Sequence, residues 1–249
     1  MSTLDAYHAT RARQEALVPR YAKKMRRALQ LSVAPALALH EAGASPELAA
    51  AGVTSKEVIT VLVALYVDCG LAEARITYNS LTPAVKALAP VALVSQWGAR
   101  LRGFITGEGA ESVRRITETT RKKVKAVLQQ AAAAGDGVAV AAKKLRDEVA
   151  AFSVVRSKRI VRTELVSASN YGSTLGAEAT GLRLEKFWIA TPDGRTRPEH
   201  AAADGQGAPL QGGMFTVGGY PCRYPGDPIL PAGERCNCRC SVGFRKPII

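Results

Sequence analysis

The C-terminal third of the chain constrains the fold most, because regular hydrophobic periodicity stops there. Leu182 to Ile189 alternates imperfectly between apolar and polar residues, which predicts a strand. Turn signals follow at Pro192-Asp193-Gly194 and Pro225-Gly226-Asp227, where proline fixes one backbone dihedral and glycine supplies a positive one. Four of the five cysteines also lie here. We expect a small, loop-rich module held together by a specific site.

The residues before this module show helical spacing. The sequence predicts helices over residues 11–39, 54–67, 112–134, 138–150 and 153–181. Pro83 is predicted to start a further helix, which Pro90 interrupts. We therefore expect an α+β fold that is mainly α-helical in its N-terminal and middle regions and ends in a small loop-rich α+β module. The predicted ranges are a helical N-terminal region (1–105), a basic helical region (106–180) and a small α+β module containing cysteine and histidine (181–249).

The net charge of +13 is unevenly spread. Residues 100–165 alone hold fifteen Lys and Arg against seven acids. A surplus of this kind attracts phosphate backbones through counterion release, while the few aromatic residues argue against base stacking. The alternative is that these residues form ordinary solvated helix faces. The candidates for contact with a DNA backbone are Arg114, Arg115, Arg121, Lys122, Lys125, Lys143 and Lys144.

Neither a secretory signal nor a membrane span is predicted. The first twenty residues contain no apolar stretch of the kind that a signal peptide needs. The most apolar run, from Val58 to Val67, is shorter than the ~20 residues that cross a bilayer, so we expect a buried helix and no membrane partner. Five cysteines, an odd number, do not resemble an extracellular disulfide framework. Synthesis in a reducing cytoplasm is the expectation.

The cysteines near the C-terminus suggest a metal site. Cys236, Cys238 and Cys240 alternate, so neighbouring side chains share one face if the backbone is extended. His200 and Cys222 are candidates for the remaining corners, and zinc is the metal expected for sulfur and nitrogen ligands. A site that used all three alternating cysteines would need a bend. The alternatives are reduced, buried cysteines without a metal, or a disulfide formed after cell lysis.

A histidine and an acid at helical spacing suggest a second kind of chemistry. His200 lies four residues before Asp204, so the two share a face if this stretch is helical, and Asp204 could then fix the imidazole tautomer. A hydrolytic interpretation uses His200 as general base and Arg195 or Arg197 as the group that binds an anion. No serine or cysteine stands in a recognisable nucleophile motif beside them. The alternative is a histidine that binds a metal or hydrogen-bonds a turn.

Arg162-Thr163-Glu164 lies on a predicted helix, where neighbouring side chains point in different directions. We expect Glu164 to pair with an arginine of the C-terminal module. Arg162 is expected to pair with an acid or a carbonyl of the same module. These contacts would hold the helix and the module together.

Taken in order, the motifs of the second half of the chain resemble the phage Mu F-like head morphogenesis family, also called minor head proteins. The ordered set comprises Trp97; Ile116, Thr119 and Thr120; Arg162-Thr163-Glu164, Asn170 and Gly172; Lys186 and Trp188; Asp193, Arg197, His200 and Asp204-Gly205-Gln206; Pro225-Gly226-Asp227; and Asn237-Cys238-Arg239-Cys240. Each motif is weak alone, but the ordered set is specific. The motif residues to which we assign structural roles are Arg162, Glu164, Trp188, Asp193, Arg197 and Asp204. The resemblance favours His200, Cys238 and Cys240 as the ligands of one structural zinc.

The resemblance implies a structural virion component of a tailed bacteriophage and not an enzyme. Its expected place is the head interior or the portal vertex, after assembly in the host cytoplasm. The expected partners are the portal protein, the major capsid or scaffolding protein, and the backbone of double-stranded DNA, contacted non-specifically during assembly, packaging or ejection. Some relatives carry a toxin domain after this module, and none is expected here because the chain ends at Ile249. The alternatives are a metal-dependent enzyme acting on nucleic acid, centred on His200 and Asp204, and a bacterial DNA-binding accessory protein.

Overall fold

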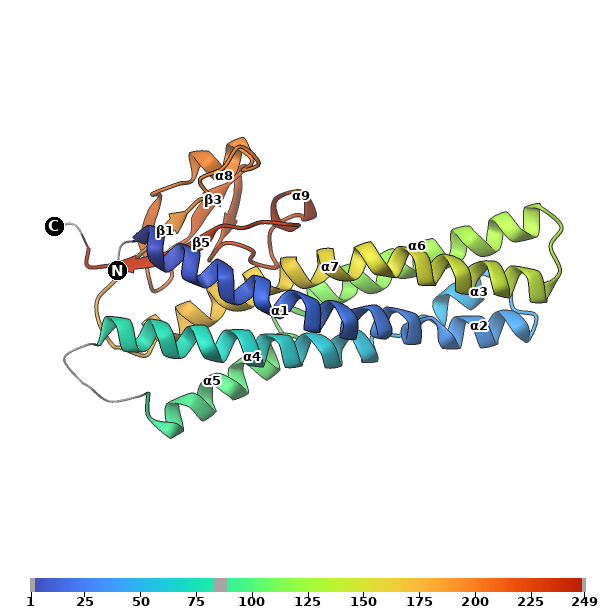
Figure 1. Cartoon of the computed structure of the whole chain (residues 1–249), viewed down its shortest axis with the longest axis horizontal. Helices are drawn as coiled ribbons and strands as arrows, with labels where there is room; N and C mark the ends of the chain where they lie inside the picture. Colours follow the sequence, from blue (N-terminus) through green and yellow to red (C-terminus); the bar gives the residue numbers. More distant parts are fainter. Residues whose placement is uncertain (1–2, 83–88, 248–249) are drawn as a thin grey trace. The chain divides into compact units, whose positions relative to one another are not determined.

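The computed structural model describes residues 3–82 and 89–247 and confirms the α+β class (Figure 1). The helices are α1 (Thr3–Ser32), α2 (Ala34–Glu41), α3 (Pro46–Ala51), α4 (Lys56–Leu81), α5 (Val91–Phe104), α6 (Ala110–Ala133), α7 (Val138–Glu178), α8 (Pro198–Ala202) and α9 (Ala232–Arg235). The strands are β1 (Glu185–Ile189), β2 (Gly207–Pro209), β3 (Phe215–Val217), β4 (Tyr220–Cys222) and β5 (Ser241–Arg245). Long helices thus precede a module of short strands and turns.

The chain packs into two compact units that are discontinuous in sequence. Unit 1 consists of Met1–Val18, Val63–Phe104 and Arg162–Ile249, and unit 2 of Pro19–Leu62 and Ile105–Val161. Helices α1, α4 and α7 each contribute residues to both units. The three ranges predicted from the sequence divide the chain by composition, whereas packing groups segments that are far apart along it.

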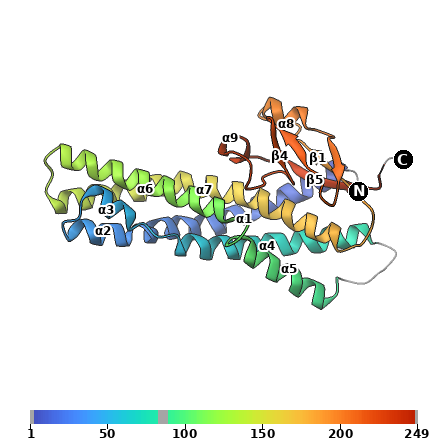
Figure 2. The ribbon, with the colours of Figure 1, turned by 180° about the vertical axis from the view of Figure 1, so that it is seen from behind.

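In unit 1, β1 is the centre of a three-stranded antiparallel sheet in the order β2-β1-β5, and β3 pairs with β4 in a separate hairpin. Figure 2 shows β1, β4, β5 and α8 as one group. Alternate residues of β1 are buried, and Trp188 packs with Phe215, Val242 and Val166 of α7 in the core of the module. The strand predicted from residue 182 onward is therefore confirmed. A left-handed glycine, Gly181 (φ 67°), separates it from the helical region.

The helix predicted to break near residues 150–153 is a single helix, α7, of 41 residues. A new helix was expected to start at Ser153, a residue type that also favours N-caps. Its hydroxyl instead donates to the carbonyl of Ala150 at 3.1 Å, a bond that satisfies serine inside a helix. In unit 1, α7 comes very close to α4. A Cβ atom added at Gly172 would lie 2.2 Å from the carbonyl oxygen of Gly70, so the contact requires glycine.

In unit 2, the basic helix α6, predicted over residues 112–134, buries one apolar face. Its buried residues include Val113, Ile116, Thr120, Val124, Val127 and Leu128. Val124, Leu128 and Leu145 belong to one apolar cluster together with residues of α2 and α3. The hydroxyl of Ser45 accepts the backbone N–H of Leu48 at 3.2 Å and thereby caps the start of α3.

Three predictions about the N-terminal helices need correction or fall outside the description. The single helix predicted over 11–39 is two helices, α1 and α2. Pro83 lies outside the described residues, and α5 begins at Val91, directly after Pro90. The helix predicted over 54–67 does not end at Val67 but continues to Leu81, as α4.

Within the described residues, one stretch is long and apolar enough to cross a membrane by length and composition, Pro46–Leu81. Core helices of globular proteins have the same length and composition, so this stretch is weak evidence for a membrane span. Val58, Leu62, Leu65 and Tyr66 of α4 are buried, at the spacing of one helix face. This burial agrees with the buried helix that the sequence predicts.

Candidate metal centre

His200, Cys238 and Cys240 form one buried group in unit 1. Proline at the first position of α8 starts the short helix that carries His200, and the two cysteines precede β5. The Nδ1 atom of His200 lies 3.4 Å from the Sγ atom of Cys240 and 3.6 Å from that of Cys238. All three side chains are at most 3% exposed. These are the three residues that the resemblance favours as metal ligands.

Cys236 and Cys222, the other two candidate metal ligands, lie outside this group. Asn237 has a left-handed backbone conformation (φ 55°), which places a bend between Cys236 and Cys238. Cys236 is half-buried, and its backbone carbonyl accepts a hydrogen bond from the guanidinium of Arg197 at 2.5 Å. Cys222 is buried on β4. Within the described residues, the group of potential metal ligands contains neither of these two cysteines.

The three donors strongly affect one another's protonation. A hydrogen bond from Cys238, and then the neighbouring His200, lower the pKa of Cys240 to about 5 despite its burial. The same hydrogen bond, together with burial, raises the pKa of Cys238 well above its usual value. Burial lowers the pKa of His200, but its hydrogen bond to Cys240 and its contact with Glu234 outweigh this and raise the pKa. The pair of thiols is thus poised to hold one negative charge beside the imidazole.

This donor set fits zinc. For a tetrahedral ion with bonds of ~2.0 Å to nitrogen and ~2.3 Å to sulfur, the nitrogen and sulfur atoms lie roughly 3.5 Å apart. The two measured separations are 3.4 and 3.6 Å. The second ring nitrogen of His200, Nε2, lies 3.1 Å from the Glu234 carboxylate, the kind of partner that orients metal-binding histidines. The same distances suit a hydrogen-bonded cluster of thiols and imidazole.

Asp204 does not fulfil its predicted role. Helix α8 ends at Ala202, so the four-residue offset does not place Asp204 on the face of His200. The Asp204 carboxylate instead accepts the backbone N–H of Ala190 at 2.8 Å. The carboxylate that contacts His200 is that of Glu234, which the sequence analysis did not identify. The pair on which the hydrolytic interpretation rests is therefore absent.

The helix α7 is tied to the module, partly as predicted. Glu164 forms a buried ion pair with Arg235 of α9 at 2.7 Å, which confirms the expected arginine partner. Arg162 does not pair with the module as predicted but with Glu15 of α1, at 3.6 Å. Asn170, which was named above only as a motif residue, also links α7 to the module. Its side-chain amide donates to the carbonyl of Cys240 at 3.2 Å and accepts the N–H of Val242 at 2.9 Å.

The remaining motif residues support the same part of the module. Trp188 is buried, with its ring edge-on to His200 at 5.6 Å between centroids. Asp193 forms ion pairs with Arg239 and, at 3.2 Å, with Arg195. Arg239 is a further residue that the sequence analysis treated only as part of a motif. These contacts hold the segments around the cysteine–histidine group in place.

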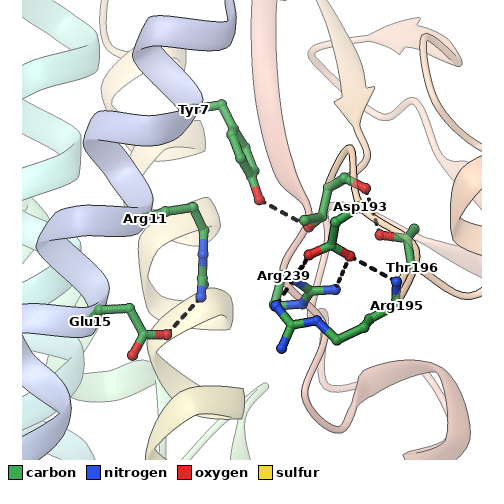
Figure 3. Close-up of polar contacts among 8 residues, drawn as sticks. Tyr7, Arg11, Glu15, Asp193, Arg195, Thr196 and Arg239 are labelled. Atoms are coloured by element: carbon green, nitrogen blue, oxygen red, sulfur yellow. Dashed lines mark hydrogen bonds and ion pairs between the residues drawn. The ribbon is translucent and has the colours of Figure 1, made fainter.

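A cavity of about 740 Å³ opens beside the group. Its walls include His200, Cys238 and Cys240, and also residues of α1, among them Tyr7 and Arg11. Figure 3 shows these α1 side chains facing two segments of the module, the one that carries Asp193 and the one that carries Arg239. The hydroxyl of Tyr7 donates to that of Thr191 at 3.0 Å. Sequence reasoning did not place α1 here, because no local pattern indicates such a distant contact.

The predicted DNA-contacting residues lie in unit 2, on or near the surface. The two units differ in charge: unit 2 holds 18 of the 34 Lys and Arg and 9 of the 21 acids, and so carries nine of the thirteen net positive charges. Lys122 is exposed. Six of the seven candidates are paired with nearby acids: Arg114 and Arg115 with Glu111, Arg121 with Glu118, Lys125 with Glu47, Lys143 with Asp147, and Lys144 with Asp136.

Comparison with known proteins agrees with the motifs. Residues 122–243 match the family described as Phage Mu protein F like protein. The match spans 122 of the 249 residues, just under half of the chain, and supports the resemblance to the phage Mu F-like family that the ordered motifs predict. Among individual proteins, the chain is similar to the minor head protein GP7 of Bacillus phage SPP1, with 27% identity over 117 residues. The similarity covers 46% of this chain and 37% of that protein, so the chain matches little more than a third of its relative. No solved structure gives a significant match.

Proposed function

We propose that this chain is a structural component of the head of a tailed bacteriophage and acts by binding rather than by catalysis. The observation that carries the proposal is the family match over residues 122–243. That segment is continuous in sequence and comprises the second half of α6, all of α7 and the module into β5. The named relative is a minor head protein. The proposed place of this chain is the head interior or the portal vertex, after assembly in the host cytoplasm.

The module is the proposed docking part for the portal protein and for the major capsid or scaffolding protein. Its internal bonding supports this role. Asn170 bridges α7 to two loops, and the buried pair of Glu164 and Arg235 adds a second tie. A surface that is already ordered loses less conformational entropy when it binds a partner. We expect such a module to bind as a rigid body.

The test is to detect the chain in particles and to measure its association with the portal. Mass spectrometry of purified heads should find the chain, and co-expression with the portal protein of the same phage should give a stable complex. Asn170→Ala should weaken this complex, because it removes the bridge. Asn79→Ala, at an exposed position of α4, is the matched control and should change nothing. Heads assembled with the gene intact but without the chain would contradict the proposal.

The proposed contact with the DNA backbone is assigned to α6 in unit 2. Surface ion pairs of the kind made by Lys125 contribute little stability, so a phosphate group can replace the acid at low cost. We expect affinity without sequence preference that falls steeply with salt. The double variant Lys122→Gln, Lys125→Gln should lower the slope of log affinity against log salt by about two. Arg183→Gln, an exposed change in unit 1, is the control. An unchanged slope in the double variant would count against this assignment.

We further propose that His200, Cys238 and Cys240 hold one structural zinc. A bound ion would neutralise thiolate charge and tie α8 to the segment before β5. Purified protein should contain close to one zinc per chain, and a chelator should lower its melting temperature. Cys238→Ser should lower both values, whereas Cys222→Ser, at a buried cysteine outside the group, should keep the zinc content. Zinc-free protein whose melting responds to neither zinc nor chelator would rule the ion out.

A further inference from the structure

We propose that the cavity beside the cysteine–histidine group is a binding site for a phosphate-bearing ligand. Its walls carry five arginines that come from separate segments: Arg11 of α1, Arg162 of α7, and Arg195, Arg197 and Arg239 of the loops. This site goes beyond the proposed function. All its residues belong to unit 1, whereas the proposed contact with the DNA backbone uses the basic helix of unit 2.

The charge of the cavity favours an anion. The walls contain five arginines and two carboxylates, Glu15 and Asp193, so that arginines outnumber carboxylates by three. Each carboxylate is shared by two guanidinium groups. Glu15 lies 2.8 Å from Arg11 and 3.6 Å from Arg162, and Asp193 contacts both Arg195 and Arg239. A guanidinium has five N–H donors, so sharing one carboxylate leaves donors on each arginine for a ligand.

Arg197 differs from the other four arginines. Its guanidinium donates to two backbone carbonyls, that of Cys236 at 2.5 Å and that of Glu234 at 3.5 Å. Within residues 3–82 and 89–247 it forms no ion pair with a carboxylate. Carbonyl oxygens orient a cation without cancelling its charge. Arg197 is thus a fixed positive group in the wall of the cavity.

The shape of the site is set by contacts between α1 and the module, both within unit 1. Figure 3 shows Arg11 and Glu15 on one side, the pair of Asp193 and Arg239 on the other, and Tyr7 reaching the loop. The volume of about 740 Å³ lies within the usual range for small-molecule sites. Asn237 also lines the cavity, in a left-handed conformation that is uncommon outside glycine. Such conformations are concentrated at ligand sites.

The number and type of the cations favour phosphate over a single carboxylate. Guanidinium groups form bidentate bonds to either anion. One guanidinium, with two parallel N–H donors, is enough to bind a carboxylate. A phosphate offers more oxygen acceptors and carries up to two charges. Five arginines around one cavity match the more highly charged group. The phosphate can come from inorganic phosphate, from a mononucleotide or from a single-stranded nucleic acid, and the experiment separates these sources.

Isothermal titration of the purified full-length chain tests the site with four probes: inorganic phosphate, adenosine monophosphate, a short single-stranded DNA and citrate. The variants are Arg162→Gln and Arg195→Gln, whose side chains are 50% and 82% exposed. The matched control is Arg100→Gln, since Arg100 is also in unit 1, is 54% exposed and pairs with Glu178 at 3.3 Å. Losing a charge-assisted hydrogen bond should weaken binding of the phosphate probes by roughly tenfold.

The result that supports the site is phosphate binding that weakens in both cavity variants and is unchanged in Arg100→Gln. The tightest of the three phosphate probes identifies the source. Failure of all three to bind, equal binding by Arg195→Gln and the intact chain, or tighter binding of citrate would overturn the proposal. Melting curves check that each variant folds. The double variant Lys122→Gln, Lys125→Gln of unit 2 should keep phosphate binding, so this site and the proposed DNA contact can fail separately.

Discussion

Replacing Arg235 by methionine should strongly destabilise unit 1, because the change leaves the Glu164 carboxylate buried without its cation. The two side chains are 6% and 2% exposed, and their charged atoms lie 2.7 Å apart. The hydroxyl of Tyr66 also donates to this carboxylate, at 2.9 Å. Burial lowers the pKa of Arg235, but the Glu164 carboxylate outweighs it and raises the pKa above its usual value. Removing one member of a buried pair costs about 3–5 kcal/mol. For a unit of this size, that lowers the melting temperature by roughly 10 °C.

Urea and thermal denaturation, followed by circular dichroism and tryptophan fluorescence, measure this loss. The double variant Arg235→Met, Glu164→Leu should recover most of it, since replacing both charges by apolar groups removes the unpaired carboxylate. The control is Arg100→Met, which breaks a pair with an arginine side chain 54% exposed and should cost less than about 1 kcal/mol. The reasoning fails if Arg235→Met costs no more than the control, or if the double variant is as unstable as the single one.

Two further predictions concern packing and thiol chemistry. Gly172→Ala places a Cβ atom 2.2 Å from the carbonyl oxygen of Gly70, so we expect a loss of about 2 kcal/mol or more in a melting curve. Gly103→Ala meets nothing within 4 Å and should be neutral or stabilise α5 by about 0.5–1 kcal/mol; similar melting of the two variants would contradict the packing argument. Burial raises the pKa of Cys222 to about 12, so iodoacetamide at pH 8 should modify it much more slowly than the half-buried Cys236. Peptide mass spectrometry after timed alkylation gives the order, and modification of Cys222 first would refute it.

The sequence predicted the elements whose signal is local. The helix over residues 112–134 and the strand from residue 182 are indicated by patterns that repeat over a few positions, and both were found. The continuity of α7 was missed because the preference of Ser153 for a helix start was outweighed by a hydrogen bond inside the helix. The two units were not predictable, since they depend on which parts of α1, α4 and α7 pack together.

In the candidate site, too, contacts between distant parts of the chain could not be predicted from local spacing. The ordered motifs pointed to His200, Cys238 and Cys240 as one group, and the structure brings them together. Asp204 was expected beside His200 from helical spacing, but α8 ends before it. Glu234, the actual partner, lies 34 residues away along the chain. A lone glutamate on a four-residue helix gives no signal in the sequence that distinguishes it from any surface acid.

The cavity combines a part of the chain that the family match covers with a part that it does not. His200, Arg197 and Arg239 lie within the matched residues 122–243, whereas Tyr7 and Arg11 belong to α1. The cysteine–histidine group needs only residues of the matched segment, so it does not depend on α1. The charge and shape of the cavity do depend on α1, because this helix supplies an arginine and a contact to the loop at 3.0 Å. Proteins that share the matched segment but begin with a different helix are therefore expected to keep the group and to differ in what the cavity binds.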